Sequence, residues 1–159
     1  MMLNKRKLAG FPTALVMAGG LLASAATCFA ASDMESLIDE RQQGFKAMGK
    51  GMKALNKGLK ADELNLAELA AAASAIADNA GKIDGWFPAG SGMESGVETE
   101  ALDYIWKNNS KFTSITADMV TAAKALLAAT EGGDAGAIQN ALGEAGKSCK
   151  ACHNSFRED

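Results

Sequence analysis

Histidine is almost absent from this sequence. Among its 159 residues the only histidine is His153, and the chain has three cysteines and two prolines. A single imidazole excludes a catalytic triad, a pair of acid–base histidines and a histidine-rich metal site. Most catalytic schemes that depend on histidine are therefore unavailable to this protein.

Aromatic residues make up only 6% of the chain, and alternating β-branched runs, which would indicate strands, are missing. Apolar residues recur instead at helical spacing in four stretches. These run from Ser32, from about Asn65 to Lys82, from about Thr99 to Ala129, and from about Asp134. They predict an all-α fold, an antiparallel four-helix bundle. The longest break, Asp84 to Glu98, is expected to be a crossing loop.

The first thirty residues have the form of a secretory signal. A basic start at Lys5–Lys7 is followed by an apolar stretch from about Phe11 to Ala26 and by small residues. We expect cleavage after Ala30, so that residues 1–30 are a signal peptide and residues 31–159 form one mature domain. A lipoprotein anchor on Cys28 is disfavoured by the preceding Thr27. The expected location is the periplasm of a Gram-negative bacterium, without a membrane anchor.

The mature chain is acidic. Cleavage would remove three basic residues and no acidic ones, which leaves 13 basic against 19 acidic residues. A protein with this balance is a poor candidate for binding nucleic acid or an anionic membrane.

The most specific motif is Cys149-Lys150-Ala151-Cys152-His153. Two cysteines three apart, followed by histidine, are the pattern to which haem c is attached, with the histidine ligating the iron. A zinc site is disfavoured because it needs about four ligands. A thioredoxin-like redox pair is disfavoured because it expects a strand before the motif. A plain disulfide between the two cysteines is the remaining alternative. The cysteines fall on the apolar side of the last helix, which places the haem in the bundle core.

Two residues of the first helix interrupt or extend its apolar side. Arg41 stands where an apolar residue is expected, so it is either a snorkelling or surface-paired arginine or a partner for a haem propionate. Phe45, one turn later, is either core packing or a cover for the haem face opposite His153. Met48 and Met52 could ligate iron but are more typical of core packing.

Taken together, these residues resemble cytochrome c′, the high-spin class II c-type cytochromes. The resemblance covers essentially the whole mature chain. Its elements are Arg41-Gln42 followed by Phe45, the loop from Phe87 to Ser91, Thr99-Glu100-Ala101, Ile105-Trp106, and the terminal motif with Arg157 after it.

The resemblance implies a four-helix bundle with one covalent haem c and a five-coordinate iron, usually paired as a homodimer. It also assigns site residues: haem attachment by Cys149 and Cys152, iron ligation by His153, and a haem pocket formed by Arg41, Gln42, Phe45, Thr99, Glu100 and Arg157. Phe45 matches the residue that blocks the sixth coordination site.

The expected function is the binding of small gases, NO and CO, with one-electron redox chemistry and an unidentified redox partner. The alternative is a low-spin class II electron carrier; such relatives place a methionine where this chain has Phe45. We do not expect an enzyme, because no distal histidine is available for acid–base chemistry.

Overall fold

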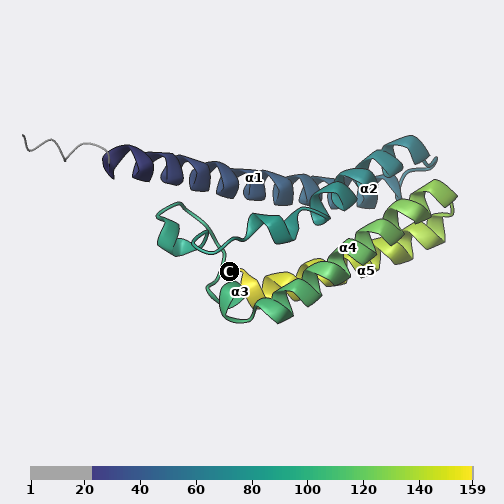
Figure 1. The fold of residues 1–159 in the computed structure, drawn as a ribbon. Coiled ribbons are helices and arrows are strands. Elements are labelled where there is room, and N and C mark those ends of the chain that lie inside the picture. The colour runs from purple at the N-terminus through teal and green to yellow at the C-terminus, as the bar shows by residue number, and fades with distance from the viewer. Residues whose placement is uncertain (1–22, 159) are drawn as a thin grey trace, which may run out of the picture.

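The computed structural model describes residues 23–158 of the chain. Its four long helices are α1 (Ala23–Gly58), α2 (Leu66–Ala80), α4 (Asn109–Gly132) and α5 (Ala135–Phe156). The long connection between α2 and α4 carries the short elements η1 (Ile83–Trp86), η2 (Met93–Ser95) and α3 (Tyr104–Lys107). Figure 1 shows α1 and α2 on one side of the bundle and the α4–α5 pair on the other. The predicted all-α four-helix bundle is confirmed.

Side-chain caps explain why two helices start where the sequence predicts. The Asn65 side chain accepts a hydrogen bond from the Glu68 amide, and the Asp134 side chain accepts one from the Ala137 amide. Gly133, with a φ of 76°, ends α4 in the left-handed conformation that glycine tolerates. The connection between α4 and α5 is therefore a tight turn.

Two predicted helix starts are wrong. α1 begins at Ala23 instead of Ser32, through an alanine-rich stretch that favours helix. The third helix does not start at Thr99, because the Leu102 amide donates to the Phe156 carbonyl and the Glu158 amide donates to the Glu100 carbonyl. Residues 99–102 are thus held against the C-terminal segment. Helix resumes only in α3 and α4, which a kink at Asn108 separates.

The predicted signal segment falls mainly on residues outside the described part of the chain, so its cleavage after Ala30 stays a prediction. In residues 23–158 no helix is long and apolar enough to cross a membrane.

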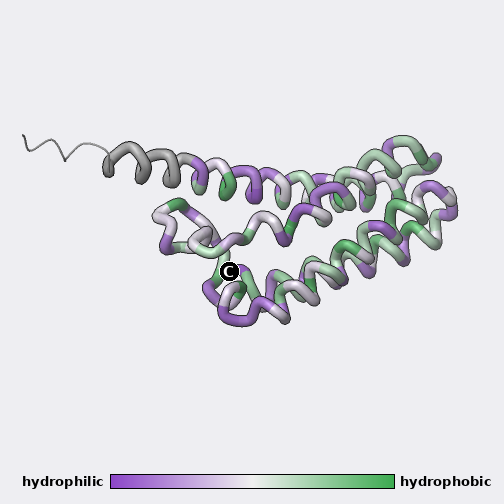
Figure 2. The backbone as a smooth tube through the Cα atoms, in the orientation of Figure 1, coloured by the Kyte–Doolittle hydropathy of each residue, from purple (hydrophilic) through white to green (hydrophobic). Residues whose placement is uncertain are grey.

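The core follows the predicted apolar sides of the helices. Figure 2 shows hydrophobic and hydrophilic residues alternating along each helix, as expected where one side is buried. Leu66 is an exception: at the start of α2 it is 41% exposed. Gly51 allows α1 to approach α2 closely, because a β-carbon there would lie 2.9 Å from the Ala72 carbonyl oxygen and 2.8 Å from Ile76 Cγ1.

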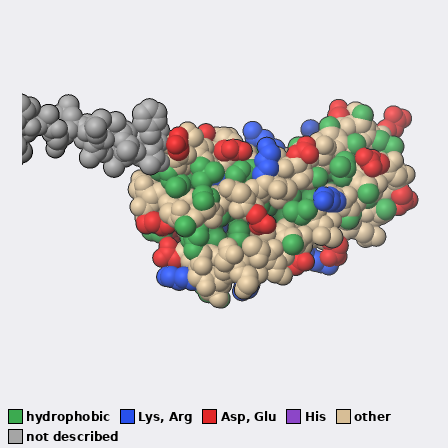
Figure 3. All heavy atoms as spheres, viewed as in Figure 1, with side chains coloured by type: hydrophobic (Ala, Val, Ile, Leu, Met, Phe, Trp, Pro, Cys, Tyr) green, Lys and Arg blue, Asp and Glu red, His purple; other side chains and the backbone are tan. Residues whose placement is uncertain are grey.

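The four helices are not packed equally against one another. α1 packs on α2, α2 on α4 and α4 on α5, whereas α1 and α5 touch at few points. Hydrophobic side chains gather on the face between α1 and the α4–α5 pair (Figure 3). The bundle therefore has a cavity between its first and last helices.

Candidate haem-binding site

The cavity between α1 and α5 has a volume of about 980 Å³ and is also lined by α4 and the long connection. That size lies at the upper end of the usual range for ligand sites. All nine residues predicted for the site line it: Arg41, Gln42, Phe45, Thr99, Glu100, Cys149, Cys152, His153 and Arg157. The fold brings together residues more than a hundred positions apart.

The α5 side of the cavity carries both thiols and the imidazole. Cys149 and Cys152 are partly buried free cysteines, and Cys149 Sγ lies 3.9 Å from the Met119 sulfur. Burial raises the pKa of Cys149, and burial together with Cys149 raises the pKa of Cys152 to about 11. Both thiols are therefore protonated at neutral pH. A disulfide between them, one of the alternatives from sequence, is not present.

His153 is held in its neutral form. Partial burial and the nearby Arg157 guanidinium lower its pKa, while Glu100 opposes them. Neutral imidazole is the form that ligates a metal.

The α1 side carries a buried arginine. Arg41 is 2% exposed, and its guanidinium lies 4.5 Å from the centre of the Phe87 ring. One terminal nitrogen donates to the Trp86 carbonyl at 3.3 Å and to the Ser91 carbonyl at 3.0 Å; the other donates to Thr99 Oγ1 at 2.7 Å. The interpretation of Arg41 as a snorkelling or surface-paired residue is wrong.

No carboxylate pairs with Arg41 among residues 33–158. Burial lowers the pKa of the Arg41 guanidinium, but an arginine keeps its proton inside a protein. A buried positive charge thus stands at the cavity wall with neutral hydrogen-bond acceptors only. Such a charge suits an anionic group of a ligand in the cavity.

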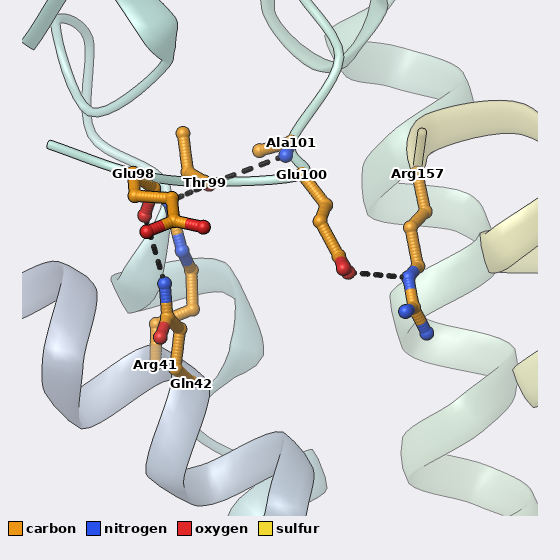
Figure 4. Close-up of polar contacts among 7 residues, drawn as sticks. All are labelled: Arg41, Gln42, Glu98, Thr99, Glu100, Ala101 and Arg157. Carbon is orange, nitrogen blue, oxygen red and sulfur yellow. Dashed lines mark hydrogen bonds and ion pairs between the residues drawn. The ribbon is translucent and has the colours of Figure 1, made fainter. Parts of the chain in front are cut away.

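Arg41 and Gln42 together tie the long connection to α1 (Figure 4). Gln42 Nε2 donates to the Glu98 carbonyl at 2.9 Å, beside the contact between Arg41 and Thr99. The side chains of these neighbouring residues therefore set where residues 98–99 meet the cavity.

Glu100 and Arg157, which were also predicted to lie in the haem pocket, form an ion pair with each other (Figure 4). Arg157 Nε and Glu100 Oε2 are 2.6 Å apart, with both side chains at least half exposed. An exposed pair contributes little to stability. Together with the backbone bonds of residues 100–102, it fastens the connection to the end of α5, beside His153.

Phe45 lies on the wall formed by α1. Its ring is half-buried, with its centre 5.4 Å from that of Trp86 and 6.2 Å from that of Phe87. This packing fixes the ring beside the cavity. Met48 and Met52 line the same wall further along α1.

Sequence reasoning missed two residues that shape the site. Ser91 is fully buried, and its carbonyl and hydroxyl oxygens accept hydrogen bonds from Arg41. Its only sequence signal was its place at the end of the Phe87–Ser91 element. Met119 is one of the apolar residues at helical spacing between Thr99 and Ala129, a pattern that carries no signal for a site.

The residues present fit haem c. Two reduced thiols at positions i and i+3 and an imidazole at i+4 line one side of a large, mostly apolar cavity, and an uncompensated arginine lies across it. Fold and site define a helical-bundle protein of the c-type haem class.

Comparison with known proteins gives the family. A family profile for cytochrome c′ matches residues 36–157. The chain is 36% identical to cytochrome c′ of Pararhodospirillum photometricum over 125 residues, which are 78% of this chain and 98% of that one. It is 32% identical to cytochrome c′ of Allochromatium vinosum over 144 residues, 89% of this chain and 92% of that one. The chain belongs to the cytochrome c′ family, and its cofactor is a covalently attached haem c.

Solved structures agree. Cytochrome c′ from Thermochromatium tepidum superposes with a TM-score of 0.74 at 30% identity, covering 79% of this chain and 97% of that one. A cytochrome c′ described with ligand-controlled dimer dissociation has a TM-score of 0.73 at 29% identity over the same shares. The nitric oxide complex of a cytochrome c′ variant from Alcaligenes xylosoxidans, at 22% identity, has a TM-score of 0.70 and shares the fold; the match covers 79% of this chain and 97% of that one.

Proposed function

We propose that this protein is a periplasmic c-type cytochrome that binds NO and CO at a five-coordinate haem iron and exchanges single electrons. The observation that carries the proposal is Phe45 on the α1 wall of the cavity, with His153 on the α5 wall. A phenyl ring has no lone pair for iron and no hydrogen-bond donor for a polar adduct. The side of the haem away from His153 would then be open, tight and apolar, which suits neutral diatomic gases.

Each remaining site residue has a separate task. Bound haem supplies an iron that changes oxidation state by one electron and coordinates small gases. Cys149 and Cys152 would hold the group by thioether bonds, and His153 would ligate the iron from α5. Arg41 would offset the negative charge of a propionate, since it has no carboxylate partner among the described residues.

A low-spin electron carrier is the second candidate. Met48 and Met52 both line the cavity, and a thioether can occupy the sixth position of a haem iron. Phe45 precedes them on the same side of α1, and its ring is held by Trp86 and Phe87. The gas-binding function is favoured because Phe45, which cannot ligate iron, stands at the position where low-spin relatives carry a methionine.

Absorption spectra of the reduced holoprotein, with and without NO and CO, test the proposal. We expect both gases to change the haem bands at once, because no protein ligand has to leave. A reduced spectrum that does not change under saturating CO would favour the electron carrier. Release of the haem from the protein on acid–acetone extraction would contradict its covalent attachment to Cys149 and Cys152.

We further propose that the protein is exported to the periplasm, acts as a binding and electron-transfer protein instead of an enzyme, and forms a homodimer. The basic and apolar segment before Ala30 supports export. The likeness to a cytochrome c′ with a ligand-controlled dimer supports self-association. Analytical ultracentrifugation of the mature holoprotein with and without CO tests this; a monomer under both conditions contradicts the dimer.

A further inference from the structure

The aromatic residues of the mature domain form one connected chain. After residue 30 the sequence has only seven aromatic residues. Six of them follow one another as neighbouring rings with centre-to-centre distances of 5.0–6.2 Å, in the order Trp86, Phe45, Phe87, Phe112, Phe156 and Tyr104. Trp106 branches from Phe87 at 6.3 Å. These distances are those of interacting aromatic pairs.

The chain connects the cavity with the surface. Its four phenylalanines line the cavity, and Phe156 follows His153 by one turn of α5. Tyr104 is stacked on Phe156 with 28° between the ring planes and is 40% exposed. Trp86, at the other end of the chain, is 3% exposed. Tyr104 is therefore the most exposed of the seven rings, since the others are buried or half-buried.

Tyrosine and tryptophan are the side chains that give up one electron most readily, and tyrosine must lose its phenolic proton when it does so. The Trp106 indole N–H donates to the Phe87 and Pro88 carbonyls, both at 3.1 Å, and neither carbonyl can take the proton. The exposed Tyr104 phenol can release its proton to water. The Lys111 ammonium, 5.5 Å from the Tyr104 ring, disfavours a cation there and so favours the deprotonated radical.

We propose that Tyr104 supplies electrons to an oxidant at the haem site by tunnelling through the packed rings of Phe156 and Phe112, and so becomes a radical at the protein surface. The proposal rests on the proposed function, because a peroxide must reach the open side of the haem. The protein's own Tyr104 is the electron donor, so the step modifies the protein and turns over no external substrate. One hydrogen peroxide takes up two electrons and two protons and gives two waters, as its O–O bond breaks. The electrons and protons come from Tyr104 of two molecules, which become phenoxyl radicals. These join through a carbon–carbon bond between the rings, as dityrosine.

The test uses the holoprotein with hydrogen peroxide. Tyr104 is the only tyrosine of the protein sequence, so a tyrosyl radical in a freeze-quenched EPR sample and dityrosine fluorescence can be assigned to it directly. We expect both signals, together with a covalent dimer that resists SDS. In Tyr104→Phe all three should fall to background. This variant keeps the ring stack on Phe156 and loses only an exposed hydroxyl, so its folding should be unaffected.

A transplanted tyrosine is the matched control. Leu66 is 41% exposed, almost the same as Tyr104, but lies at the start of α2, toward the opposite end of the bundle (Figure 1). The double variant Tyr104→Phe, Leu66→Tyr should not cross-link if electrons travel along the ring chain. Equal cross-linking in the double variant would show that a diffusing oxidant is responsible and would overturn the proposal.

The haem absorption bands distinguish a failure of the proposed open haem site from a failure of the proposed oxidation of Tyr104. If peroxide changes the haem spectrum of wild type but Tyr104 gives no radical and no dityrosine, the aromatic route is wrong and the open site stands. If peroxide leaves the haem spectrum unchanged, the open site and the route that depends on it are both wrong.

Discussion

Replacing Arg41 with leucine removes the contacts that hold the long connection to α1. Two carbonyls, those of Trp86 and Ser91, lose their donor, at about 1–3 kcal/mol each for buried groups left unpaired. The contact over Phe87 is worth about 1–2 kcal/mol more. Since leucine regains part of this by packing, we expect a net loss of about 4 kcal/mol. That is a large share of the roughly 5–15 kcal/mol by which a domain is stable.

Guanidinium unfolding of the holoprotein, followed by circular dichroism, measures this loss. The stability of Arg41→Lys should lie between those of wild type and Arg41→Leu. A lysine keeps the positive charge, but its single ammonium cannot donate to all the acceptors that the two terminal nitrogens of Arg41 reach. Gln42→Leu, which removes one hydrogen bond to the Glu98 carbonyl, should cost about 1 kcal/mol. If Arg41→Leu were no more damaging than Gln42→Leu, the anchoring role would be refuted.

Three further outcomes are expected. Gly51→Ala should destabilise the holoprotein by about 1–3 kcal/mol, because the added carbon would press against α2. Gly143→Ala, where no atom lies within 4 Å of the added carbon, should stabilise it by about 0.5–1 kcal/mol. Thermal unfolding measures both changes. Cys152 of the haem-free protein should react slowly with iodoacetamide at pH 8 and speed up toward pH 11, because burial raises its pKa to about 11; a midpoint below pH 9 would contradict this. Glu100→Gln should lower stability by less than about 1 kcal/mol, since its pairing with Arg157 is exposed, and a larger loss in urea unfolding would show that the pair is stronger than an exposed ion pair.

The local pattern of the sequence predicted much of this fold. Apolar spacing located the starts of two helices, and the structure places the capping side chains of Asn65 and Asp134 there. The unexpected arginine at position 41 pointed to a special contact, and that residue is buried at the cavity wall. These features depend on neighbours within a few residues, or on a polar group where the helix pattern requires an apolar one.

The parts that failed depend on distant residues. The sequence predicted that a helix begins at residue 99. In the structure the backbone of residues 100 and 102 forms hydrogen bonds with the C-terminal segment, more than fifty positions later. The partners of Arg41, above all the Ser91 carbonyl, are backbone groups whose position depends on the path of the whole connection. No local pattern contains that path.

The ferric EPR spectrum tests the central claim most directly, that the face of the haem opposite His153 is left open because Phe45 cannot ligate. It should be recorded for wild type and for Phe45→Met under the same conditions. The account predicts a high-spin, five-coordinate signal in wild type and a shift toward low spin in Phe45→Met, where a thioether replaces the ring. A predominantly low-spin wild-type signal would contradict it.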